Sequence, residues 1–197
     1  MRKVLIIATS PRKKGNTDLL AQWAADIAQE NNYESEIIYL REYRFSPCIA
    51  CGACNKDGRC HVKDEMIPLY PKITGSEKII FTAPIYFQAL GALPKALIDR
   101  TQCYWAAHYI LNEKVIRDDS FRAKRGLFAL LCGATNLPDT FLCAEKSLKI
   151  FASTVEANYE GGLFFPDIDE KGAIREKTDV KEKLTRGLNS FLQKKSS

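Results

Sequence analysis

The clearest signal for the fold lies at residues 4–17, which read VLIIATSPRKKGNT. Residues 4–8 are short and continuously apolar, which is typical of a strand buried on both faces of a parallel sheet. Apolar residues then recur at helical spacing, namely Leu20, Trp23, Ala24, Ile27 and Ala28. We therefore expect a strand, a polar turn and an amphipathic helix in this order.

The same alternation continues along the chain. Further strand-like runs occupy residues 36–40, 78–83 and 126–132, and helix-like stretches occupy residues 89–100, 139–153 and 176–194. Residues 155–159 alternate between apolar and polar, which favours an exposed edge strand. Strands that alternate with helices predict parallel βαβ units, and therefore an α/β fold with a doubly wound parallel sheet.

The length of 197 residues favours one domain over residues 1–197, with a cysteine-rich loop at residues 44–63 (the cysteine loop) inserted after the second strand. No apolar run approaches the roughly 20 residues that a membrane helix needs. The apolar run after Met1-Arg2-Lys3 is also too short for a signal peptide, so we expect a cytoplasmic protein that does not bind membranes. The net charge of +5 is too modest to indicate a nucleic-acid partner.

Parallel sheets bind ligands beyond the carboxyl ends of their strands. The loop after residue 8 offers hydroxyls at Ser10 and Thr17, a cation at Arg12, a flexible Gly15 and the free N–H groups of a helix N-terminus. These groups suit an anion, and because the loop lacks the motifs that bind triphosphates or dinucleotides, a phosphate monoester fits best. The alternative is an ordinary strand-to-helix turn with Asn16 or Thr17 as the N-cap.

Two further loops end neighbouring strands. Residues 84–87 combine a proline with two aromatic side chains, which can wall a flat ring system or simply cover the top of the core. Cys132 and Gly133 are small enough to let a ligand approach the backbone, although Gly133 alone could also just end the strand.

Four of the seven cysteines crowd together as Cys48, Cys51, Cys54 and Cys60. Three thiols at a repeat of three residues can curl around a compact inorganic core, and a fourth nearby completes the ligand set of a [4Fe–4S] cluster. A zinc site with four cysteine ligands and a set of metal-free thiols are the alternatives. The other cysteines, at positions 103, 132 and 143, are expected to be small buried side chains.

Together, these residues resemble the NADPH-dependent FMN reductase-like family, and within it the iron-sulfur flavoproteins. The matching pieces are residues 10–17, the cysteine loop with the Lys-Asp-Glu-Met that begins at Lys63, residues 83–87 and residues 95–100. The resemblance implies a flavodoxin-like fold with five parallel strands in the order 2-1-3-4-5. It also implies FMN, with its phosphate in the first loop and its ring against residues 84–87, and a homodimer or homotetramer.

The resemblance assigns roles to individual residues. The expected cofactor contacts are Ser10, Arg12, Gly15, Asn16, Thr17, Pro84, Ile85, Tyr86, Phe87, Cys132 and Gly133, and the expected iron ligands are Cys48, Cys51, Cys54 and Cys60. Because the redox chemistry belongs to the cofactors, no side chain is named as a catalytic acid or base.

Three classes of function remain open at this point. The first is an electron-transfer flavoprotein with FMN and a [4Fe–4S] cluster, which exchanges electrons with a ferredoxin-like carrier. The second is a cluster-free oxidoreductase that uses NAD(P)H to reduce free flavin, quinones or similar acceptors. The third is a non-enzymatic thiol sensor or a zinc-stabilised scaffold on the same fold.

Overall fold

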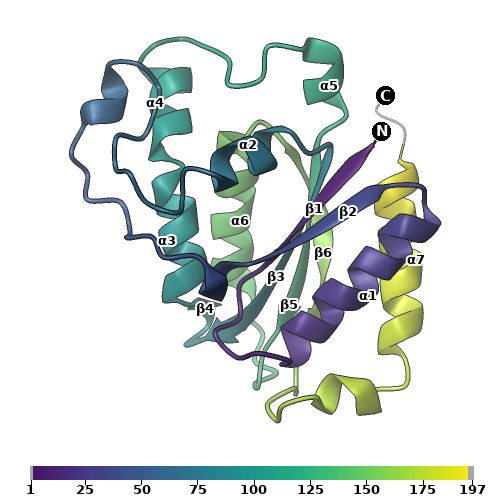
Figure 1. Cartoon of the computed structure of the whole chain (residues 1–197). Helices are drawn as coiled ribbons and strands as arrows, with labels where there is room; N and C mark the ends of the chain where they lie inside the picture. The colour runs from purple at the N-terminus through teal and green to yellow at the C-terminus, as the bar shows by residue number, and fades with distance from the viewer. Residues whose placement is uncertain (1, 195–197) are drawn as a thin grey trace.

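A computed structural model describes residues 2–194 of the chain, and it contains a twisted sheet with helices on both faces (Figure 1). Five strands are parallel, in the order β2-β1-β3-β5-β6. Their bounds are β1 Lys3–Ala8, β2 Glu34–Tyr39, β3 Lys78–Tyr86, β5 Gly126–Cys132 and β6 Asn158–Phe165. This confirms the doubly wound sheet and the order 2-1-3-4-5 of its parallel strands.

A sixth, two-residue strand was not predicted. It is β4 (Ala89–Leu90), which pairs antiparallel with the end of β3 through Tyr86–Ala89 and Ile85–Leu90. The helix expected over residues 89–100 therefore begins later, as α3 (Ala92–Arg100). The turn between β3 and β4 consists of Phe87 and Gln88, which both adopt positive φ.

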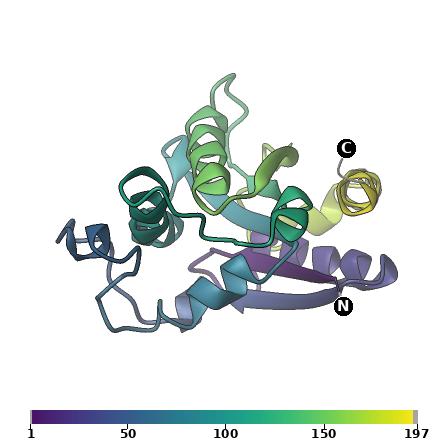
Figure 2. The same cartoon turned by 90° about the horizontal axis from the view of Figure 1, so that it is seen from above.

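The helices divide between the two faces of the sheet (Figures 1 and 2). One face carries α1 (Asn16–Glu30), η3 (Ala173–Glu176) and α7 (Val180–Gln193). The other face carries α2 (Leu69–Thr74), α3, α4 (Gln102–Tyr109) and α6 (Leu142–Thr154). Short turns η1 (Leu40–Glu42) and η2 (Ala53–Asn55) and the short helix α5 (Asp119–Ala123) lie in the connections.

The continuous apolar run of β1 has a direct structural cause. Val4 and Ile6 face the core under α1 and α7, whereas Leu5 and Ile7 face the core under α2, α3 and α6. All four side chains are almost completely buried, and each such burial contributes about 1.5–3 kcal/mol to stability. β1 is therefore a central strand whose side chains pack into the cores on both faces of the sheet. This packing fixes the position at which the following loop begins.

The alternation at residues 155–159 was only partly interpreted correctly. β6 is the edge strand, but it begins at Asn158, and Val155 is a completely buried residue at the end of α6. Near the start of β6, Glu160 forms a buried ion pair with Lys78 at 2.8 Å. Gly126 lies directly against this pair, since a Cβ there would be 2.1 Å from the Glu160 carboxylate.

The cysteine loop follows β2 and η1 and packs through η2 against α4, at the far side of the molecule from α7 (Figure 2). Gly58 has a φ of 70°, and a Cβ at this position would lie 2.9 Å from that of Ala107. The close approach of the loop to α4 therefore requires glycine at position 58. Within residues 2–194, none of the helices combines the length and the apolar character that a membrane crossing demands.

Candidate functional site

The three loops singled out in the sequence meet at the carboxyl ends of β1, β3 and β5. They line a pocket of about 130 Å³ together with the segment after β6. The lining residues are Ser10, Arg12, Gly15, Asn16, Thr17, Pro84, Ile85, Tyr86, Cys132, Ala134, Ile168, Asp169 and Lys171. All of the expected cofactor contacts except Phe87 and Gly133 are in this set.

The first loop is anchored to the sheet and leaves the start of α1 open. The backbone N–H of Thr9 and its hydroxyl both donate to the carbonyl of Thr82, at 3.0 and 2.9 Å. Ser10 Oγ accepts the N–H of Arg12 at 3.1 Å, which closes a tight turn. Gly15 is the N-cap of α1, so neither Asn16 nor Thr17 has this role, and no side chain caps the first N–H groups. These free donors and the helix dipole favour a bound anion.

Asn16 uses its side chain to hold the segment after β6. Its Nδ2 donates to the carbonyl of Glu170 at 2.8 Å, and its Oδ1 accepts the N–H groups of Gly172 and Ile174 at 2.9 and 3.3 Å. Only the backbone of Asn16 therefore remains for a ligand. These contacts bring the Lys171 segment to the pocket.

The segment of residues 168–171 was not predicted as part of the site. No motif marks it, but it follows the carboxyl end of β6, which is the same edge of the sheet as the other loops. The general rule for ligand sites in α/β sheets would have pointed to it. Lys171 adds a second cation to the pocket beside Arg12.

Phe87 does not line the pocket. It is fully exposed at the tip of the β3–β4 turn, with a φ of 48°, and Gln88 beside it has a φ of 60°. Tyr86 is partly exposed and packs closely on Gly91, where a Cβ would lie 2.9 Å from the Tyr86 ring. The hairpin thus presents one aromatic side chain to the pocket and one to solvent. Cys132 is buried, which raises the pKa of its thiol to about 12.

A buried ion pair lies behind the first loop, and the sequence analysis missed both of its members. Arg41, in η1, donates to Asp18 Oδ1 at 2.8 Å and to the carbonyl of Ser10 at 3.2 Å. Asp18 is in the first turn of α1, and its second oxygen accepts the N–H of Lys14 at 2.7 Å. The loop between Ser10 and Lys14 is therefore fixed at both ends by this pair.

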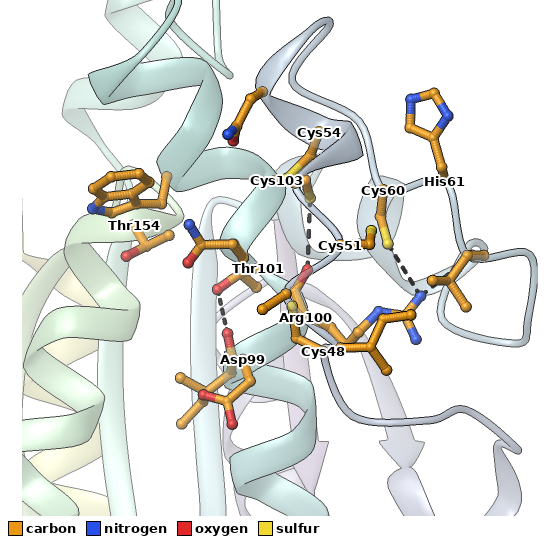
Figure 3. Close-up of a pocket in the computed structure, with 18 of the residues that line it drawn as sticks. Cys48, Cys51, Cys54, Cys60, His61, Asp99, Arg100, Thr101, Cys103 and Thr154 are labelled. Carbon is orange, nitrogen blue, oxygen red and sulfur yellow. Dashed lines mark hydrogen bonds between the residues drawn. The ribbon is translucent and has the colours of Figure 1, made fainter.

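A second, larger cavity of about 520 Å³ lies at the cysteine loop (Figure 3). The thiols of Cys48, Cys51, Cys54 and Cys60 all line it, as does Cys103 at the start of α4. Trp105, Ile110 and Ile150 line it as well. The four expected iron ligands thus share one cavity, which is separate from the pocket at the N-terminus of α1.

Arg100, at the end of α3, connects both ends of the cysteine loop. Its side chain is 1% exposed and pairs with Asp64 at 2.6 and 3.0 Å. It also donates to the carbonyls of Ser46 and Val62 at 2.9 and 3.3 Å, and to Cys60 Sγ at 3.4 Å. Figure 3 shows the Cys60 thiol directed at this guanidinium.

The environment of Cys60 favours the thiolate. Burial by itself raises the pKa of this thiol, but Tyr70, the backbone N–H of Val62 and Arg100 outweigh burial and lower the pKa below its usual range. In contrast, burial raises the pKa of Cys103 to about 11. Cys143 is exposed on α6, so the expectation that it is buried was wrong.

The described part of the chain holds no group of three or more histidine, cysteine, aspartate or glutamate side chains close enough to bind a single metal ion. Cys48, Cys51, Cys54 and Cys60 nevertheless all line one cavity. His61 is paired with Asp57 at 3.1 Å and is half exposed. His108 is also exposed and lies 4.0 Å from Glu156, on a different surface from the pocket at α1.

The chain is similar to a known protein family and to several curated proteins. The family model described as NADPH-dependent FMN reductase matches residues 2–155. An iron-sulfur flavoprotein of Methanocaldococcus jannaschii is 36% identical over 100 residues, which are 51% of this chain and 52% of that relative. An iron-sulfur flavoprotein of Methanosarcina thermophila is 33% identical over 113 residues, which are 57% of this chain and 59% of that relative. The match therefore spans little more than half the length of these relatives.

A solved structure shares the fold over the whole chain. It is an FMN-dependent NADH-azoreductase from Bacillus anthracis in complex with FMN, with a TM-score of 0.65, 13% sequence identity and complete coverage of both chains. At this identity the likeness supports the flavodoxin-like architecture. Because the family model matches well over half of the chain, the protein belongs to the NADPH-dependent FMN reductase family.

Proposed function

We propose that the protein is an FMN-dependent oxidoreductase that binds the FMN phosphate at the N-terminus of α1. The observation that carries this proposal is the convergence of Ser10, Arg12 and Thr17 with uncapped backbone N–H groups in one pocket. The pocket of about 130 Å³ is smaller than the roughly 300 Å³ of a site that encloses a whole ligand. It therefore suits the phosphate end of FMN, and the ring would rest outside it against the β3–β4 hairpin.

The residues of this pocket would bind and orient the cofactor. Arg12 and Lys171 would offset part of the phosphate charge, and Thr17 would donate a hydrogen bond from its hydroxyl. Pro84, Ile85 and Tyr86 would offer one wall and backbone polar groups to the ring. When bound, FMN supplies the chemistry, since it accepts either a hydride or single electrons. No protein acid or base is needed at the pocket.

We also propose that Cys48, Cys51, Cys54 and Cys60 hold a [4Fe–4S] cluster. Four thiols that line one cavity are the ligand type and number that such a cluster takes. Three of them recur at every third residue, whereas a structural zinc site usually draws its cysteines from two separated pairs. The buried cation Arg100 would offset part of the negative charge of the cluster and its thiolates.

With both groups in place, the protein would exchange electrons between a one-electron carrier and FMN. A cluster passes one electron at a time, whereas FMN handles one or two. A small ferredoxin-like protein is the expected partner. We further propose a homodimer or homotetramer, because Trp105, Tyr109 and Ile110 are partly exposed beside the cysteine cavity, and an exposed apolar patch of this kind suits a protein contact.

The second candidate is a cluster-free oxidoreductase that takes electrons from NAD(P)H. One observation favours it: the family is described as NADPH-dependent. In this case the cysteine loop is held by the Arg100–Asp64 pair and by its packing against α4, and the acceptor is a free flavin, a quinone or a similar small molecule.

A single preparation separates these candidates. The protein is purified without oxygen, and its visible spectrum, iron, acid-labile sulfide and zinc are measured per subunit. A flavin spectrum on broad absorbance, with about four irons and four sulfides, supports the first candidate. A flavin spectrum with no metal supports the second. A colourless protein contradicts both and leaves a thiol sensor or, with one zinc, a stabilised scaffold.

A further inference from the structure

The ion pair behind the first loop includes a carboxylate near the proposed phosphate site. The negative charge of this carboxylate must be offset if a phosphate is to bind there. Asp18 lies in the first turn of α1 and is 2% exposed. The dipole of the helix stabilises a carboxylate at this position. A phosphate bound at the same helix end would, however, add a second negative charge at the first turn of the helix, on the other side of the loop from this carboxylate. Because a buried charge is poorly screened by salt, the repulsion would persist under physiological conditions.

Arg41 supplies the opposite charge. Its guanidinium is 2.8 Å from Asp18 Oδ1, and its side chain is only 12% exposed. It also stacks on the Tyr39 ring at 4.5 Å, which fixes its position from the other side. The Asp18–Arg41 pair has no net charge, so the first turn of α1 keeps its preference for an anion.

The same pair controls the shape of the loop. Lys14 has a φ of 57°, an unfavourable backbone conformation for a residue with a side chain. Its N–H donates to Asp18 Oδ2 at 2.7 Å, and this bond holds the turn that leads into α1. At the start of the loop, the Arg41 guanidinium donates to the Ser10 carbonyl at 3.2 Å, and it also donates to Asp18 at 2.8 Å, so it links the two ends.

We propose that Arg41 is a positioning residue for a phosphate monoester at the N-terminus of α1, and that it acts by neutralising the buried charge of Asp18. This inference rests on the proposed function. It can be tested by separating the effect of the Asp18 charge from the effect of the loop shape. Asparagine at position 18 keeps an oxygen that can accept the N–H of Lys14, yet it carries no charge.

The test compares FMN with riboflavin, which has the same ring but no phosphate. Dissociation constants for both flavins are measured by fluorescence titration of flavin-free protein. The ratio of the two dissociation constants measures the contribution of the phosphate to binding, and it does not depend on catalytic activity. The variants are Arg41→Ala, Arg41→Lys, Asp18→Asn and the double variant Asp18→Asn with Arg41→Ala.

Arg41→Ala should lower the preference for FMN over riboflavin by about tenfold or more, since it leaves a buried carboxylate beside the phosphate. Riboflavin affinity should stay within about twofold of the wild type. The double variant should regain most of the lost preference because it removes the uncompensated charge. Arg41→Lys should fall between Arg41→Ala and the wild type.

The outcomes separate this inference from the proposed function. A wild-type protein that binds both flavins equally contradicts the phosphate site itself. A wild-type preference for FMN that persists in Arg41→Ala overturns the inference, as does a double variant that is as weak as Arg41→Ala. If Arg41→Ala does not fold, Asp18→Asn provides the test. This variant removes the negative charge and keeps Arg41, so the preference for FMN should stay the same or increase. A tenfold decrease in Asp18→Asn would overturn the inference.

Discussion

The buried guanidinium of Arg100 donates a hydrogen bond to the Cys60 thiol at 3.4 Å while it pairs with Asp64 at 2.6 Å. One side chain from α3 thus connects the Cys60 thiol, whose pKa it helps to lower, with the residues at the end of the cysteine loop. The loop has only one turn of 3₁₀ helix of its own, at η2. Its order therefore depends on contacts made by Arg100.

Replacement of this cation should loosen the loop. Arg100→Met should lower the free energy of unfolding by about 3 kcal/mol, because it leaves Asp64 without its partner in a mostly buried position. Hydrogen exchange should become faster at residues 44–63. Arg59→Met removes an exposed arginine from the same loop and should change stability by less than about 0.5 kcal/mol. Equal effects of the two variants would contradict the anchoring role.

The four loop cysteines should act as one unit. Replacement of Cys48, Cys51, Cys54 or Cys60 by serine should each lower iron and sulfide in protein prepared without oxygen, while the flavin stays bound at its separate pocket. Cys143→Ser is the matched control, since Cys143 is exposed on α6 and does not line the cavity. Full iron content in any of the four variants would exclude that residue as a ligand.

The cation of the first loop should matter for binding and little for folding. Arg12 is exposed and lines the pocket at α1, and a hydrogen bond to a charged group contributes about 1.5–3 kcal/mol. Arg12→Ala should therefore weaken FMN binding roughly 10- to 150-fold, as titration of flavin-free protein would show. The melting temperature of that flavin-free protein should not change. Lys124→Ala, an equal loss of charge far from the pocket, should leave the affinity unaltered.

The flavin should be FMN and not FAD. The pocket has one set of uncapped helix N–H groups, at the start of α1, and its volume of about 130 Å³ suits a single phosphate. Flavin released by heat and compared with standards by chromatography identifies the species. A majority of FAD would contradict the prediction.

Two glycines allow a matched test of packing. Gly126→Ala should destabilise the protein by about 1–3 kcal/mol, because its Cβ would be 2.1 Å from the Glu160 carboxylate that pairs with buried Lys78. Gly187 lies inside α7, and a Cβ there would be 3.0 Å from the flexible end of Leu163 and in ordinary contact with Phe128 at 3.6 Å. Gly187→Ala should be neutral or should stabilise the protein by up to about 1 kcal/mol. Urea denaturation of both variants measures the difference.

The parallel strands were predicted well from the sequence, because a strand that is buried on both faces is a short, continuous run of apolar residues. β5 was predicted with its observed bounds, Gly126–Cys132, and every residue in it is buried. In contrast, α4 was not predicted, because its apolar and aromatic residues show no clear helical period. The helix packs against the cysteine loop, and this contact cannot be read from the spacing of its residues. β4 was also missed, because its turn uses Phe87 and Gln88 in place of the Asn-Gly pair that marks such hairpins.

The pocket at α1 was predicted from the loops that follow the strands. The two residues that support its first loop, Asp18 and Arg41, were not predicted. Asp18 and Arg41 are 23 positions apart and become partners only when β2 pairs with β1. Nothing in the spacing of charges along the chain distinguishes this pair from a solvent-exposed aspartate and arginine. Such supporting contacts become visible only in the folded structure.

The three hydrogen bonds of Asn16 also set an order of events during synthesis. Their partners, Glu170, Gly172 and Ile174, are encoded more than 150 residues later. While the ribosome is still making the middle of the chain, the first loop and α1 can form, but the wall that contains Lys171 does not exist. Whatever ligand this pocket takes, a nascent chain can enclose it only after the last strand has emerged, so that ligand loading belongs to the final stage of biogenesis.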